Sequence, residues 1–125
     1  MRDDRTEADD IVRGASNRAL LDLILPNIRR VARDRGYAIA IHGSLCRDID
    51  LIAIPWREHQ IESRDGLVLA LTGAIAGVTG RCNRMKDWTE KPHGRSATTI
   101  LVWCGSTTTD IDLSVIAAST PAGAE

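Results

Sequence analysis

The spacing of apolar residues changes along the chain, and each change predicts a different element. Between residues 11 and 32 apolar side chains recur every three or four positions, which predicts an amphipathic helix that turns most of its arginines to water. Pro26 lies inside this pattern, so we expect the helix to kink there or to divide in two. Gly36 follows the pattern and suits the position just after a helix.

Most of the remaining apolar residues gather in short runs rich in β-branched side chains, which predict strands. The stretch 38–56 holds two such runs joined by a short glycine-containing turn and is typical of a β-hairpin. A second hairpin is expected over 97–116. Between the two, the stretch 66–78 is apolar on nearly all sides and predicts a well-packed helix capped by Ser63 or Asp65.

This order of helix, hairpin, helix and hairpin predicts an α+β fold in which helices pack on one face of a small sheet, mostly antiparallel or mixed. Residues 81–95 are polar and are expected to form a loop, with room for one strand in its first half. A chain of 125 residues has the size of a single domain, with an ordered core over about 11–117 and flexible ends at 1–10 and 118–125.

The first hairpin carries two closely spaced carboxylates. Asp48 and Asp50 are two residues apart on the expected strand, so both side chains leave the same face, roughly 6.6 Å apart along it. Neighbouring carboxylates repel each other, and a fold tolerates them mainly where a cation or a basic partner lies between them. Gly43 and Ser44 lie just upstream in a turn whose backbone N–H groups suit a phosphate. The hairpin therefore predicts a metal site beside a phosphate-binding turn.

These residues also form a recognisable motif. The phrase HGS (42–44) followed by DIDL (48–51) resembles the signature of the nucleotidyltransferase-like superfamily of the polymerase-β type, a Gly-Ser turn and then Asp-x-Asp on a strand. The phrases HGSLCRDIDLIAIPW, KPHGR and DIDLSV are similar, over most of 37–116, to small phage-encoded proteins classed as nucleotidyltransferases. The resemblance implies a minimal nucleotidyltransferase-like protein that transfers a nucleoside monophosphate from a nucleoside triphosphate to an unknown acceptor, with Mg²⁺ or Mn²⁺ as cofactor.

The same resemblance implies roles for the carboxylates. Asp48 and Asp50 would hold the metal ions, which take oxygen ligands together with phosphate. A third carboxylate is implied on another strand, where Asp110 and Asp112 share one face. We favour Asp112, which lies further inside the strand, as the catalytic and metal-binding group that activates or orients the acceptor hydroxyl. Alternatively, both residues belong only to the solvated face of an edge strand.

The phosphate contacts are implied in the same way. Gly43 and Ser44 would contact the β- and γ-phosphates of the nucleotide. In the loop KPHGR, Lys91, His93 and Arg95 would hold triphosphate oxygens, because cationic and N–H donors bind phosphate strongly. The plainer interpretation of this loop is a solubilising turn.

Other interpretations of these residues stay open. Arg47 adjoins the acids and, by neutralising them, would remove the need for a metal. The protein would then be a non-catalytic phage accessory or inhibitor protein that keeps the fold to bind a nucleotide or a host protein. His42 is either a polar group near the metal or a structural histidine. The first helix has either a solvated face or an RNA-binding surface made of Arg29, Arg30, Arg33 and Arg35.

Composition and charge indicate which ligands and which cellular compartment to expect. The net charge of −1 argues against broad nucleic-acid binding, and the absence of Phe leaves few rings for stacking on bases. No apolar run is long enough to span a membrane. The acidic N-terminus lacks the apolar segment of a signal peptide, and three widely spaced cysteines favour reduced thiols. We therefore expect a cytoplasmic protein, in the bacterial host if the protein is phage-encoded.

The short chain also leads to expectations about partners. A nucleoside triphosphate is the expected ligand, and a protein or an RNA the expected acceptor. Since a single small domain offers no second lobe to enclose them, a homodimer or a protein partner would complete the cleft.

Overall fold

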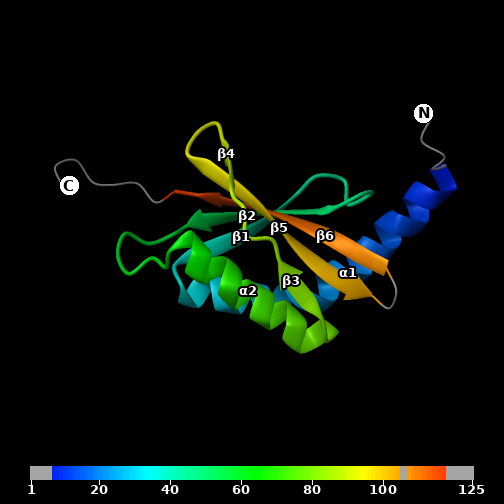
Figure 1. The fold of residues 1–125 in the computed structure, drawn as a ribbon, viewed down its shortest axis with the longest axis horizontal. Helices are drawn as coiled ribbons and strands as arrows, with labels where there is room; N and C mark the ends of the chain where they lie inside the picture. The colour runs from blue at the N-terminus through cyan, green and yellow to red at the C-terminus, as the bar shows by residue number, and fades with distance from the viewer. Residues whose placement is uncertain (1–6, 105–106, 118–125) are drawn as a thin grey trace.

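The structure, a computed structural model, describes residues 7–104 and 107–117. Along the chain, two strands follow the first helix and four strands follow the second (Figure 1). They are α1 (Glu7–Asp34), β1 (Tyr37–His42), β2 (Ile49–Pro55), α2 (Arg64–Thr79), β3 (Cys82–Arg84), β4 (Thr89–Lys91), β5 (Arg95–Cys104) and β6 (Thr107–Ile116). No helix in these described ranges has the length and apolar character needed to cross a bilayer.

All the strands belong to one sheet in which the two predicted hairpins lie side by side. The strand order is β1-β2-β6-β5-β3, and β4 pairs with the beginning of β5. Strands β2 and β6 run parallel, whereas the other neighbours are antiparallel. The predicted α+β fold with a mixed sheet is therefore confirmed, and the parallel pair joins one hairpin to the other at the centre.

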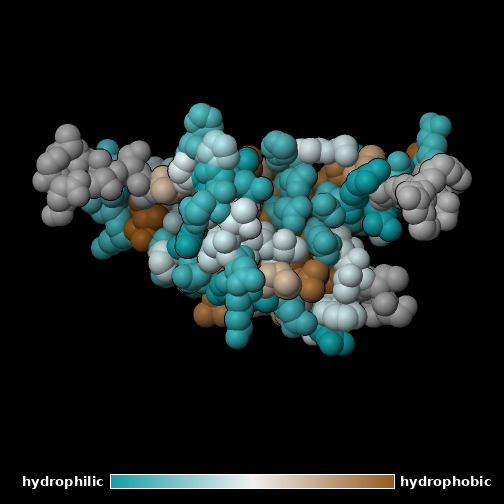
Figure 2. All heavy atoms as spheres, turned by 45° about the horizontal axis from the view of Figure 1, so that its top comes forward, coloured by the Kyte–Doolittle hydropathy of each residue, from teal (hydrophilic) through white to brown (hydrophobic). Residues whose placement is uncertain are grey.

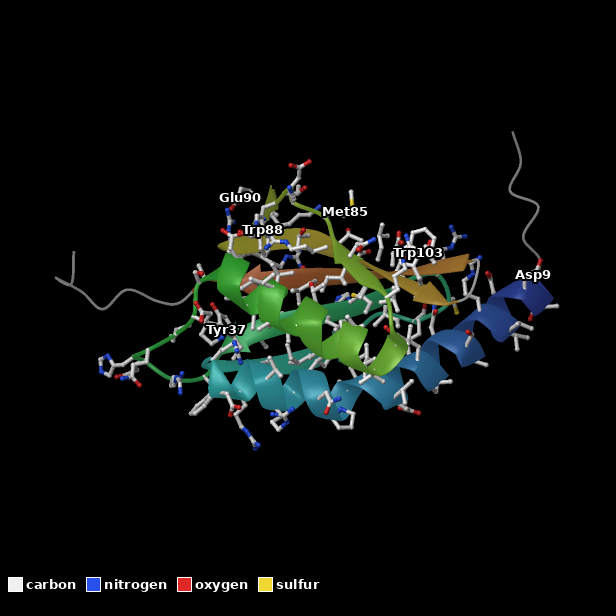
Figure 3. The ribbon with its side chains drawn as sticks, turned by 60° about the horizontal axis from the view of Figure 1, so that its bottom comes forward. Asp9, Tyr37, Met85, Trp88, Glu90 and Trp103 are labelled. Carbon is white, nitrogen blue, oxygen red and sulfur yellow. The ribbon has the colours of Figure 1, made fainter. Side chains whose placement is uncertain are left out.

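Alternate residues of the central strands form the core beneath the helices. Helices α1 and α2 contact each other and cover the same face of the sheet (Figure 3). That face is apolar and buried, with Ile49 and Leu51 from β2 and Ile111 and Leu113 from β6 each at most 2% exposed. Because successive side chains of a strand alternate, the residues between these point to the opposite face, which neither α1 nor α2 covers. This opposite face is called the open face below.

Of the two outcomes expected at Pro26, a kink or a division of the helix, the division does not occur. Helix α1 continues through this residue rather than dividing. Proline removes the hydrogen bond to the carbonyl four residues earlier, that of Asp22, but this residue is exposed, so water can replace the lost donor. The first helix also begins at Glu7, so it includes the last four residues of the stretch 1–10 that was expected to be flexible.

The predicted apolar stripe of α1 was only partly right. Its buried face includes Leu21, Ile24 and Ile28, as expected, but Val12 and Leu23 are 69% and 58% exposed. The N-terminal turns of α1 extend past the ends of the strands, toward the labelled Asp9 in Figure 3, so the sheet does not cover this end of the helix. Elsewhere apolar side chains reach the surface in small separate patches, and hydrophilic ones predominate in Figure 2.

The polar stretch 81–95 is more ordered than a loop. It contains the expected strand, β3, and a second one, β4, that was not predicted. Strand β4 turns into β5 through Pro92, His93 and Gly94, and the last two have positive φ of 67° and 71°. The predicted Ser63 cap of α2 is confirmed, since its Oγ accepts a hydrogen bond from the backbone N–H of Gly66. The predicted turn residues 105–106 and the tail 118–125 lie outside the described ranges.

Candidate functional site

Four polar side chains form a row across the open face. In the register of the sheet, His42 of β1 is opposite Asp50 of β2, which is opposite Asp112 of β6, which is opposite Thr99 of β5. Residues opposite each other share a face, and neighbouring strands lie about 4.8 Å apart. Two carboxylates predicted from separate hairpins are therefore brought side by side at the centre of the sheet.

Asp110 and Asp112, the two candidates for the third carboxylate, occupy different surroundings. Asp112 is the residue in register with Asp50, and its Oδ1 accepts a hydrogen bond of 3.1 Å from the Thr99 hydroxyl. Asp110 lies two residues earlier and lines a different cavity. The geometry therefore favours Asp112 as the third carboxylate. Thr99 was not predicted; its only signal was an outward position in a β-branched strand.

Asp48 approaches the same pair from outside the strand. It was expected within β2 but lies one residue before it, in the turn that follows β1. It is nevertheless within side-chain hydrogen-bonding reach of Asp112. It also lines a cavity of about 810 Å³ together with Arg13 of α1, Arg47 and Asp110. Asp48 therefore lines this cavity and not the one that Asp50 and Asp112 line. Arg13 was missed because nothing in the sequence links a helical arginine to a turn so far downstream.

Burial is the main cause of raised pKa values at Asp48 and Asp112. Burial, followed by the neighbouring Asp112, raises the pKa of Asp48, and the guanidinium groups of Arg13 and Arg47 only partly oppose this. Burial also raises the pKa of Asp112 and the charge of Asp50 adds to it, although the Thr99 hydrogen bond acts in the opposite direction. The fold therefore holds acidic groups together at a cost to their ionised forms, as functional sites often do.

A cavity of about 520 Å³ opens onto the carboxylate row. Asp50 and Asp112 form part of its floor, and His42 lies at one side. The opposite wall comes from the β4–β5 hairpin, which contributes Lys91 and Arg95. The Nε of Arg95 is buried without a hydrogen-bond partner. The cavity is within the size range of small-molecule sites, and its lining combines three carboxylates, those of Asp50, Asp87 and Asp112, with the cations Lys91 and Arg95.

The predicted residues of the KPHGR loop are not all brought to this cavity. Lys91 and Arg95 are opposite each other in the β4–β5 pair and line it. His93 occupies the tip of the intervening turn, is exposed, and is absent from the lining. The prediction for His93 therefore gains no support, because a three-residue turn projects its middle side chain beyond the sheet.

Of the two residues of the Gly-Ser turn, only Gly43 lies beside the acids. Gly43, at φ +81°, lies so close to the acids that an added Cβ would be 2.7 Å from Oδ2 of Asp50. Ser44 instead lines a cavity beside α1. The cause is Leu45, which is buried and whose carbonyl accepts a 2.6 Å hydrogen bond from the buried Asn17 of α1. Since this contact draws the turn toward the helix, the expected phosphate contact of Ser44 gains no support.

A metal ion fits this donor set only together with a phosphate. Among residues 7–104 and 107–117, no three or more His, Cys, Asp or Glu side chains converge as ligands for a metal ion. Mg²⁺, however, is usually held by one or two carboxylates with substrate phosphate and water. Asp50 and Asp112, with Asp48 nearby, meet that requirement, and Lys91 and Arg95 suit the phosphate.

Comparisons with known proteins add no further constraint. Neither the family models nor the curated proteins gave a match to this chain.

Replacing Asp112 by Asn is expected to stabilise the fold at neutral pH. The raised pKa of Asp112 means that the folded state binds its proton more tightly than the unfolded state, so this contribution is full below the unfolded pKa and is lost as pH rises through the folded pKa. Asn cannot ionise and still accepts the Thr99 hydrogen bond.

The melting temperature of Asp112→Asn should therefore exceed that of the wild-type protein at pH 7, and the difference should disappear near pH 3. Thermal unfolding followed by circular dichroism over this pH range measures it. Asp22→Asn, which removes an exposed acid of α1, is the control. A variant that is less stable than the wild-type protein at pH 7 would contradict the electrostatic account.

Proposed function

We propose that this protein is a minimal nucleotidyltransferase-like enzyme that uses Mg²⁺ or Mn²⁺ to transfer a nucleoside monophosphate from a nucleoside triphosphate to an acceptor. One observation carries the proposal: Asp50 and Asp112 lie side by side in a cavity that also holds Lys91 and Arg95. Carboxylates alone suit a cation and basic residues alone suit an anion. A cavity with both suits a metal-bound polyphosphate.

The chain's own residues would divide the work as follows. Asp50 and Asp112, with Asp48, hold the metal ion, which when bound neutralises phosphate charge and polarises the phosphoryl group. The acceptor hydroxyl oxygen bonds to the α-phosphorus, and the bond from that phosphorus to the pyrophosphate oxygen breaks. Lys91 and Arg95 stabilise the negative charge that collects on the departing pyrophosphate.

Asp112 is the best placed of the acids to take the proton of the acceptor hydroxyl. A raised pKa makes its carboxylate a stronger base than an ordinary aspartate. The Thr99 hydroxyl donates a hydrogen bond to Oδ1, which fixes the orientation of the carboxylate. Thr99 is thus a positioning residue.

The non-catalytic alternative depends on whether Arg47 neutralises the acids. Both Arg47 and Arg13 favour the charged form of Asp48, yet burial and Asp112 outweigh them and the pKa remains raised. The two guanidinium groups therefore do not fully stabilise the charged form of Asp48, which supports a site that recruits a further cation.

A thermal-shift series tests the binding part of the proposal. The unfolding midpoint is measured with Mg²⁺ or Mn²⁺ alone and with each of the four nucleoside triphosphates. A ligand that binds only the folded state raises the midpoint by mass action. We expect a rise that needs both metal and triphosphate, is absent in Asp50→Asn, and persists in the exposed control Asp22→Asn. No rise with any combination would contradict the proposal.

A further inference from the structure

A second groove, of about 430 Å³, lies at the edge of the sheet between α1 and β1. One wall is the C-terminal half of α1, with Arg29, Arg30 and Arg33, and the other side holds Ile39 of β1 and Trp56, which follows β2. Tyr37, labelled in Figure 3, marks this end of the molecule. The groove is separate from the carboxylate cavity and takes no part in the chemistry proposed above.

The arginines of this groove are available to a ligand. All three are exposed, and no hydrogen bond, ion pair or ring contact joins any of them to another residue in the described part of the chain. Arg29 and Arg33 are four residues apart and so follow each other along the helix by about 6 Å on one face. The groove therefore presents a row of guanidinium groups to an anion with more than one charge.

The indole of Trp56 adds a flat surface beside these charges. Its side chain is 53% exposed. The Arg57 guanidinium lies 5.5 Å from the ring centroid, and its Nη2 donates hydrogen bonds to the carbonyls of Asp34 and Gln60. Since Arg57 is anchored in this way, the ring is supported on one side and its remaining surface is open to stacking.

The groove and the carboxylates are connected along β2. Ile54, Ile52 and Asp50 occupy alternate positions of β2 and so point to the same open face, and Trp56 follows the end of this strand at the groove. The distance along the strand from Trp56 to Asp50 is about 20 Å, six residues at the rise of a strand. The side chains between them are apolar or small, since Ala38 and Ala40 of β1 are in register with Ile54 and Ile52. The side chains of these two pairs carry no charge.

Two other occupants of the groove are disfavoured. Strand β1 is an edge strand, and the hydrogen bond from Trp56 N–H to Gly36 O fixes the alternation, so the backbone groups of Tyr37 and Ile39 point away from β2. These two residues are only 4% and 7% exposed, which leaves little edge for an added peptide strand. A second copy pairing there would also bring the arginines of both copies together.

We propose that this groove binds a single-stranded nucleic acid and directs it along the open face of β1 and β2 toward Asp50 and Asp112, as the acceptor of the transfer. Guanidinium groups bind the phosphates and Trp56 stacks on a base, the combination by which proteins hold single strands. The role of the nucleic acid as acceptor rests on the proposed function, whereas the proposal that the groove binds it rests only on the residues of the groove.

Fluorescence anisotropy with labelled ten-nucleotide RNA and DNA strands tests the surface. Three phosphate contacts predict that the logarithm of the association constant falls with the logarithm of salt concentration with a slope of about −2. Trp56→Ala should weaken binding about tenfold, and the double variant Arg29→Ala/Arg33→Ala should reduce the slope by about 1.4. Arg18→Ala, an exposed arginine of α1 outside the groove, should change neither.

The outcomes separate this inference from the proposed function. Absence of binding at low salt, or equal binding by Trp56→Ala and wild type, overturns the inference, even where metal and triphosphate still raise the melting temperature. A polyglutamate peptide that binds with the same dependence on Trp56 also overturns it. Salt-dependent binding without any triphosphate effect supports the surface and refutes the transfer.

Discussion

The Asp50→Asn variant is expected to release pyrophosphate about 10³-fold more slowly than the wild-type protein at saturating triphosphate, the loss seen when a charge-stabilising group is removed from a transition state. Asp50 is the central acid of the row, between His42 and Asp112, and its side chain faces the cavity. The amide keeps the shape of the carboxyl group but cannot carry the charge that a divalent ion requires.

Pyrophosphate release from each nucleoside triphosphate, with RNA and protein acceptors supplied, measures this loss. Circular dichroism and the melting temperature must show that Asp50→Asn is folded, and Asp22→Asn should keep the wild-type rate. Equal rates for Asp50→Asn and the wild-type protein would remove Asp50 from the reaction.

The second large effect concerns the two faces of the sheet. Ile111→Ala should lower the free energy of unfolding by about 3 kcal/mol, because it removes a fully buried side chain beneath the helices and leaves a cavity. Ile54→Ala, on the open face, should lower it by about 1 kcal/mol or less, since Ile54 is already 39% exposed.

Urea unfolding followed by circular dichroism gives both values. The comparison is matched because the two substitutions remove the same atoms from neighbouring strands of one sheet. Similar losses at the two positions would mean that another layer covers the open face, which would close the path from the groove to the carboxylates.

The main helices and strands, and the face of the sheet on which Asp50 and Asp112 lie, could be predicted from the sequence, because both depend on local periodicity. The alternation of apolar residues around Asp50 and around Asp112 assigns each acid to the side opposite a buried stripe, and both assignments agree with the buried neighbours in the structure. Continuity through Pro26 was not predictable in this way. It depends on whether the unpaired carbonyl meets water, and the sequence does not show that.

The assembly of the site depends on contacts between distant segments. Periodicity shows that Asp50 and Asp112 each face away from a core, but only the parallel pairing of β2 with β6 makes them neighbours. Similarly, the sequence places Ser44 beside Gly43, whereas the bond from Asn17 to Leu45 draws Ser44 toward α1 and away from the acids. The unpredicted strand β4 determines which cations of KPHGR reach the cavity.

Electron paramagnetic resonance of Mn²⁺ tests the central claim most directly, because it reports the metal whether or not an acceptor is known. Free Mn²⁺ is titrated with protein in the presence of a nucleoside triphosphate, for the wild-type protein, Asp50→Asn and Asp22→Asn. We predict that the wild-type protein and Asp22→Asn bind Mn²⁺ in the presence of the triphosphate and that Asp50→Asn does not. Equal Mn²⁺ binding by the wild-type protein and Asp50→Asn would contradict a metal and nucleotide site on the open face.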